Sequence, residues 1–151
     1  MSKKMIKLIE DIFKPAAPDE KQERMRQQFM ADRDEFIETL RKNMSNGVYR
    51  GDIDLDSKMK KFEMDVFPLR SINVVEGYID VSKNDLVALK HFPKKVIFDF
   101  YCVDNKLTSL NGAPEIVKGN FYCKDNPGPN GKGFSEEDVR AVSDVKGQVI
   151  C

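Results

Sequence analysis

The chain has 151 residues, with 25 basic and 25 acidic side chains, and its formal net charge is therefore zero. This balance argues against a protein whose affinity rests mainly on neutralising nucleic-acid phosphates, and the absence of a long apolar run leads us to expect neither a membrane span nor a secretory signal. The three cysteines, an odd number for a disulfide framework, suggest a reducing, cytosolic setting.

Residues 1–47 are predicted to be helical and to form an N-terminal cap over the remainder of the chain. The apolar residues of the first segment recur with the helical period up to a short linker bracketed by Pro15 and Pro18: Met5, Ile6, Ile9, Ile12 and Phe13. A second helix is predicted from about residue 20 to residue 44, with Asn46-Gly47 as its stop signal. Three lysines near the first stripe leave a membrane surface as an alternative, but we favour packing of this helix on the domain, a partner or a second copy.

A degenerate strand is predicted at Ile53-x-Leu55, 26 residues before the matching segment Ile79-x-Val81. Aspartates alternate with its apolar residues at positions 52, 54 and 56. Because the glycine and the distal glutamate of a calcium-binding EF-hand loop are missing, we interpret these aspartates as a solvated strand face.

The second half of the chain contains a repeat of about 21 residues. The positions in register include Val75, Val96 and Val117; Ile79, Phe100 and Phe121; Val81, Cys102 and Cys123; and Asn84, Asn105 and Asn126. The middle copy fits a leucine-rich-repeat pattern, with a short strand at residues 100–102 and a turn at Asn105 whose amide satisfies backbone groups inside the coil. These features predict an α+β protein with a short leucine-rich-repeat-like solenoid (residues 48–151), an N-terminal helical cap and a C-terminal capping helix.

The C-terminal cap is predicted from local signals. The turn-forming residues 126–131 end the repeat array. Ser135 and Asp138 have the spacing of a capping box, and Phe134 and Val139 that of a hydrophobic staple. A terminal strand is expected over residues 145–150.

The repeat half resembles a class of leucine-rich-repeat-like proteins encoded mainly by large tailed bacteriophages. The resemblance lies in residues 100–102, 112–114 and 119–123, and in the tail from residue 134 to residue 147, and covers about residues 75–151. It implies a small non-enzymatic interaction protein that acts in the cytoplasm of the infected host.

No catalytic or metal-binding pattern stands out. Cys102 and Cys123 are expected at equivalent inward positions on adjacent strands, but a zinc site needs four ligands and only Cys151 and His91 remain. A disulfide between Cys102 and Cys123 is not favoured in a reducing compartment, so we interpret both as small buried core residues. We predict no enzyme, no cofactor and no metal site.

The predicted binding site is the outward face of the repeat strands. Since residues 100 and 102 point inward, Tyr101 points outward, and Tyr122 occupies the same place one repeat later. The predicted partner-binding residues are Asp80, Asp99, Tyr101, Val103, Asn120, Tyr122 and Lys124. The alternative is that the two tyrosines merely stack on each other.

Three functions remain open on the sequence. The leading prediction is a phage protein that binds and blocks or redirects a host protein. The second is a structural or assembly protein that self-associates through its amphipathic N-terminal helices. The third, against which the charge balance argues, is nucleic-acid binding through Lys58, Lys60, Lys61, Lys94 and Lys95.

Overall fold

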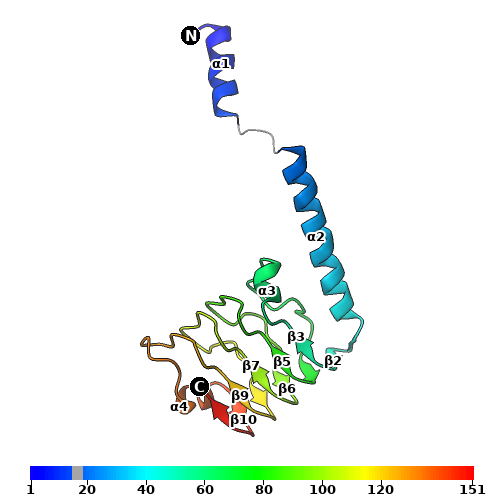
Figure 1. Cartoon of the computed structure of the whole chain (residues 1–151), viewed down its shortest axis with the longest axis vertical. Coiled ribbons are helices and arrows are strands. Elements are labelled where there is room, and N and C mark those ends of the chain that lie inside the picture. The colour runs from blue at the N-terminus through cyan, green and yellow to red at the C-terminus, as the bar shows by residue number, and fades with distance from the viewer. Residues whose placement is uncertain (15–18) are drawn as a thin grey trace. The chain divides into compact units, whose positions relative to one another are not determined.

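A computed structural model describes residues 1–14 and 19–151 (Figure 1). The predicted linker between Pro15 and Pro18 lies outside the described residues. The chain divides into two compact units, Met1–Asp32 and Arg33–Cys151, which we call the helical unit and the sheet unit. Their boundary falls within the second helix, whereas we placed the end of the helical segment at residue 47.

Two helices occupy the N-terminal part of the chain, as predicted. Helix α1 spans Lys3–Phe13 and begins at Ser2, whose hydroxyl accepts a hydrogen bond from the backbone N–H of Met5. Helix α2 spans Glu20–Arg41. Its last turns belong to the sheet unit, where Leu40 is buried and the ring of Phe36 stacks on that of Phe62 with centroids 5.2 Å apart.

Asn46 and Gly47 form a hairpin turn, so their prediction as a helix stop is wrong. Strands β1 (Met44–Ser45) and β2 (Val48–Arg50) pair antiparallel on either side of them. Asn46 and Gly47 have φ angles of 50° and 75°. Two-residue hairpins favour Asn-Gly because both turn residues need positive φ.

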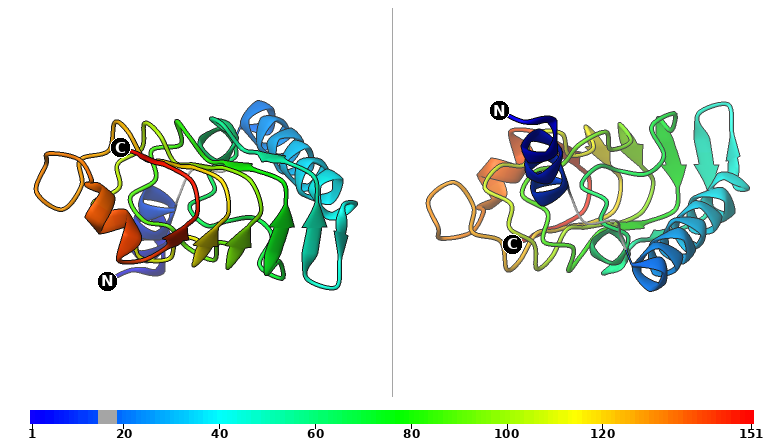
Figure 2. Two further views of the ribbon diagram at one scale, coloured as in Figure 1. Left: turned by 90° about the horizontal axis from the view of Figure 1, so that it is seen from below. Right: turned by 90° about the horizontal axis from the view of Figure 1, so that it is seen from above.

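The remaining strands form parallel pairs in two sheets (Figure 2). The six-stranded sheet has the order β1-β2-β4-β6-β8-β10 and the five-stranded sheet the order β11-β9-β7-β5-β3. The first sheet continues with β4 (Val74–Glu76), β6 (Lys95–Val96), β8 (Ile116–Val117) and β10 (Asp144–Val145). The second contains β3 (Ile53–Asp54), β5 (Ile79–Asp80), β7 (Phe100–Tyr101), β9 (Phe121–Tyr122) and β11 (Val149–Ile150).

The predicted fold class, a leucine-rich-repeat-like solenoid with helical caps, is contradicted by this arrangement. The chain is α+β, with two sheets in a sandwich-like arrangement and short helices α3 (Lys58–Lys61) and α4 (Glu136–Arg140). We assigned one strand to each repeat, at residues such as 100–102. The second strand of each repeat was missed because β6 (Lys95–Val96) has a single buried apolar residue, whereas Phe100 and Cys102 supply an alternating buried pair.

The 21-residue spacing appears as the register of the strands. Ile79 pairs with Phe100 and Phe100 with Phe121, and the degenerate strand at Ile53 pairs with Ile79 as predicted. These side chains are buried, and the Phe100 and Phe121 rings lie 5.1 Å apart. Val75, on the other sheet, is also fully buried, so both sheets contribute to the core.

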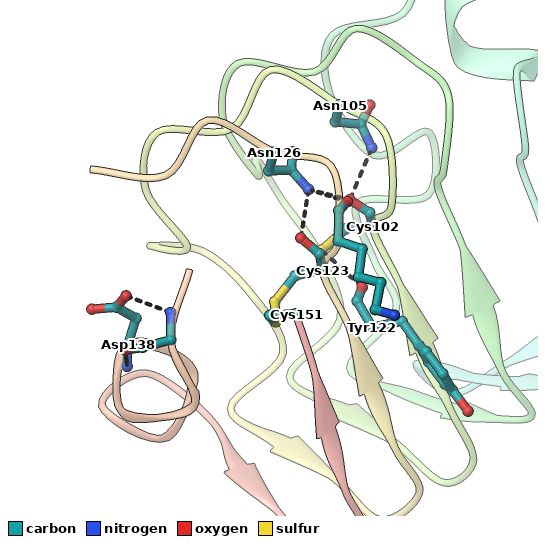
Figure 3. Close-up of a disulfide and its surroundings, with 9 residues drawn as sticks. Cys102, Asn105, Tyr122, Cys123, Asn126, Asp138 and Cys151 are labelled. Carbon is teal, nitrogen blue, oxygen red and sulfur yellow. Dashed lines mark hydrogen bonds between the residues drawn. A yellow bond between two sulfur atoms is a disulfide. The ribbon is translucent and has the colours of Figure 1, made fainter. Parts of the chain in front are cut away.

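A ladder of buried asparagines, Asn84, Asn105 and Asn126, holds the turns that follow the five-stranded sheet. Figure 3 shows two of them, Asn105 and Asn126. The Asn105 amide donates to the carbonyls of Val81 (3.0 Å), Cys102 and Val103 (both 3.3 Å). Its carbonyl oxygen accepts from the backbone N–H groups of Asn84 and Leu86, both at 3.0 Å. The amides of the other two asparagines donate in the same pattern to their own turn and the preceding one. The predicted role of these asparagines is confirmed.

The C-terminal helix has the predicted cap. The Ser135 hydroxyl accepts from the Asp138 N–H, and the Asp138 carboxylate accepts from the Ser135 N–H. Phe134 and Val139 are both buried. The single terminal strand that we predicted is instead two strands, β10 and β11, one in each sheet.

Replacing Asn105 by alanine is expected to lower the free energy of unfolding of the sheet unit by about 3 kcal/mol, because several buried backbone groups lose their partners. Urea unfolding followed by tyrosine near-ultraviolet circular dichroism measures the loss. The control Asn111→Ala changes an exposed asparagine and should stay within about 0.5 kcal/mol of the parent protein. Equal effects of the two substitutions would contradict the ladder.

Candidate protein-binding face

The outward side of the five-stranded sheet carries a row of side chains in register. Residues 54, 80, 101, 122 and 150 are neighbours along this row. They point outward because the preceding residue of most of these strands, such as Phe100 or Phe121, is fully buried. We call this row, together with residues 52, 78, 99 and 120 just before the strands, the tyrosine face.

Hydrogen bonds link four of the predicted residues on this face. The Tyr101 hydroxyl donates to Asp99 Oδ2 at 3.0 Å. The other oxygen of Asp99 accepts from the backbone N–H of Asn120 at 2.7 Å, and the Asn120 amide donates to the Tyr122 hydroxyl at 3.3 Å. Each tyrosine hydroxyl is therefore bonded to the side chain two residues before it, which fixes the direction of both rings.

The rings of Tyr101 and Tyr122 stack, as the alternative interpretation of this pair expected. Their centroids are 4.5 Å apart and their planes differ by 9°, and Tyr78 meets Tyr101 edge-on at 6.0 Å. Stacking does not remove the rings from the surface, since Tyr78, Tyr101 and Tyr122 are all only half-buried. The aromatic surface therefore stays accessible, in a fixed conformation.

The tyrosine face is acidic at the end nearer β3. Burial, followed by the charges of Asp52, Asp54 and Asp80, raises the pKa of Tyr78. Burial, the hydrogen bond to Asp99 and that residue's charge raise the pKa of Tyr101 to about 12.

The carboxylates on this face are only partly neutralised. Lys58 pairs with Asp54 at 3.3 Å. Within the described part of the chain, no lysine or arginine pairs with Asp52, Asp80 or Asp99. Negative charge is therefore available to a partner beside the aromatic rings.

The two remaining predicted residues lie in the next outward row. Val103 is half-buried, and its backbone N–H donates to the Ser82 hydroxyl at 3.2 Å. Lys124 is exposed. Tyr78 was not predicted as part of this face, although it lies 26 residues after Asp52 and 21 before Asp99 and so occupies the same column. Its backbone N–H donates to Asp52 Oδ1 at 3.0 Å.

The cysteines are arranged differently from our prediction. Cys123 forms a disulfide with Cys151, with their Cα atoms 4.6 Å apart (Figure 3), so Cys123 is not a reduced core residue. Cys102 is a free, fully buried thiol, as predicted, and burial raises its pKa. We missed the partnership because Cys151 lies 28 residues after Cys123 rather than 21.

The other polar clusters serve local structure. Asp54 accepts from the backbone N–H of Asp56 at 3.0 Å, and Asp56 pairs with Lys83 at 3.2 Å. Among the lysines considered for nucleic-acid binding, Lys60 pairs with Asp85 at 2.7 Å.

Over residues 1–14 and 19–151, no group of three potential ligands is placed to hold a metal ion. No helix in this part of the chain has the length and apolar character needed to cross a membrane.

Comparison with known protein families, with curated proteins and with solved structures finds no match to this chain. The interpretation of the tyrosine face therefore depends on its geometry and charge.

Counting thiols tests the disulfide. Non-reduced protein unfolded in denaturant should show one reactive thiol, that of Cys102, and after reduction it should show three. Folded protein should show none, because Cys102 is fully buried. Three thiols in unfolded, non-reduced protein would contradict the disulfide.

A pH titration of tyrosinate absorbance should separate Tyr101 from an ordinary tyrosine, which ionises near pH 10. Tyr101 is expected to ionise last, at about pH 12. Because the pKa of Tyr101 is raised in the folded state, its protonated hydroxyl contributes to the free energy of unfolding. This contribution is fully present below pH 10 and is lost as the pH rises towards 12. Tyr101→Phe should remove the late phase, and a titration in which all four tyrosines ionise together would contradict the raised pKa.

Proposed function

We propose that this chain is a non-enzymatic protein-binding module that uses the tyrosine face to occupy a basic surface of its partner. In the setting implied by the phage resemblance, the partner is a host protein, which the module blocks or redirects. The mechanism is steric occupation and involves no bond-making step.

The fixed pair of aromatic rings is the observation that carries the proposal. Tyrosines contribute large contact areas at interfaces, and a side chain already held in one conformation loses little entropy on binding. Tyr101 and Tyr122 are held by stacking at 4.5 Å and by the hydrogen bonds to Asp99 and Asn120. They form a rigid aromatic centre of a kind that is common in binding surfaces.

The charge of the face favours a basic partner. Asp52, Asp80 and Asp99 lack ion-pair partners among the described residues and lie near the tyrosines, two of whose pKa values they help to raise. Lysine or arginine side chains of a partner would compensate these charges. Such complementarity increases association rates and weakens with added salt.

Binding is tested by capturing partners from host lysate with the full chain and then measuring the affinity of the purified partner. Tyr101→Ala/Tyr122→Ala should reduce the affinity at least about tenfold, because it removes the aromatic centre. Tyr101→Phe/Tyr122→Phe keeps the stacked rings and should retain most of the affinity for the partner. Val87→Ala, which shortens an exposed side chain outside the face, is the control and should bind normally.

The charge contribution has a separate variant. Asp80→Asn keeps an acceptor for the backbone N–H of Ser82, with which Asp80 is bonded at 2.9 Å, while removing the charge. This variant should associate with the partner more slowly, and its affinity should depend less on salt concentration. Unchanged affinity of the double alanine variant would defeat the proposal, and unchanged salt dependence of Asp80→Asn would defeat its electrostatic part.

A further inference from the structure

Helix α1 exposes all of its large apolar side chains. None of its residues is buried, and the exposed fractions reach 60% for Leu8, 67% for Ile12 and 80% for Phe13. An amphipathic helix gains most of its stability by burying its apolar face, and an isolated helix of this length is marginal in water. The helix is therefore expected to be covered by something else.

The apolar and charged residues of α1 lie on opposite sides. With about 100° of rotation per residue, the apolar side chains from Met5 to Phe13 fall within an arc of about 160°. Lys3 and Glu10 border one edge of this arc, and Lys4 and Asp11 border the other. Each edge thus has a positive charge near the start of the helix and a negative charge near its end.

We propose that α1 packs antiparallel against α1 of a second copy of the chain. In an antiparallel pair the same edges of the two helices meet. Lys3 then lies beside Glu10 of the second copy, and Lys4 beside its Asp11. In a parallel pair opposite edges meet at the same height, which brings Lys3 near Lys4 and Glu10 near Asp11. The charge pattern therefore favours the antiparallel pair and disfavours the parallel one.

The same pattern favours a second copy over a lipid surface. Glu10 and Asp11 lie at the two edges of the apolar arc, where they would approach the phosphates of an anionic membrane. In the antiparallel pair each carboxylate instead meets a lysine. The arc is also wider than the narrow seam of a two-helix coiled coil, so each helix has room for contacts with more than one neighbour.

Sedimentation of the full chain over a range of concentrations tests this pairing. A dimer or larger assembly is expected, and Ile9→Glu should weaken association at least about tenfold, because it places a charge in the buried face. Lys7→Gln changes the net charge by the same amount on the opposite side of the helix and should leave association unchanged. A chain that stays monomeric at all concentrations overturns the proposal, whether or not it binds vesicles containing anionic lipid.

Charge exchange tests the orientation. Lys3→Glu/Lys4→Glu should weaken association of the antiparallel pair, and adding Glu10→Lys/Asp11→Lys should restore it. In a parallel pair the double variant would only replace one like-charge contact by another, so unchanged association would overturn the antiparallel arrangement.

The tyrosine face takes no part in this pairing. Tyr101→Ala/Tyr122→Ala should assemble normally, which separates a failure of this inference from a failure of the proposed function.

Discussion

The sheet unit depends on satisfying the backbone groups at the turns that follow the five-stranded sheet. The strands of the five-stranded sheet are only two residues long, so strand pairing alone leaves many buried N–H and C=O groups without partners. The ladder at Asn84, Asn105 and Asn126 fills this need, because one amide bonds to backbone groups of its own turn and of a neighbouring one. An aspartate would lack the donor N–H groups and a leucine would offer neither donor nor acceptor, so the residue type follows from the geometry.

The regular spacing of side chains on the tyrosine face follows from the parallel pairing of the strands. Once the strands repeat at a fixed register, an outward side chain on one strand stands directly beside its counterpart on the next. This spacing brings Tyr101 and Tyr122 to 4.5 Å. A second set of side-chain bonds, through Asp99 and Asn120, fastens the turns before the strands and orients the hydroxyls. The features that carry the proposed binding are thus built from contacts that also hold the sheet together.

Strong local signals and the repeat register could be predicted from the sequence, whereas features without a local pattern could not. Helices α1, α2 and α4, the capping box at Ser135 and the asparagine turns were all recognisable, whereas the short helix α3 was not predicted. The fold class was wrong because the second sheet was missed: a strand such as β6 has one buried apolar residue and therefore no alternating pattern, unlike Phe100 and Cys102. Asn46-Gly47 suits both a helix end and a hairpin, and only the pairing of β1 with β2 distinguishes them. On the tyrosine face, Tyr101 and Tyr122 were predicted, but the edge-on contact of Tyr78 with Tyr101 was not.

Strand β11 of the five-stranded sheet is linked to β9 by a disulfide as well as by strand pairing. Asn126, in the turn after β9, is the last asparagine of the ladder. Insertion of α4 also lengthens the spacing from 21 to 28 residues. The disulfide between Cys123 and Cys151 lies at this place, directly beyond the paired residues Tyr122 and Ile150. Closing a loop of this length restricts the unfolded chain by roughly 3.5 kcal/mol, comparable to several hydrogen bonds. A covalent bond thus supports the edge strand beside Tyr122, where the amide ladder ends.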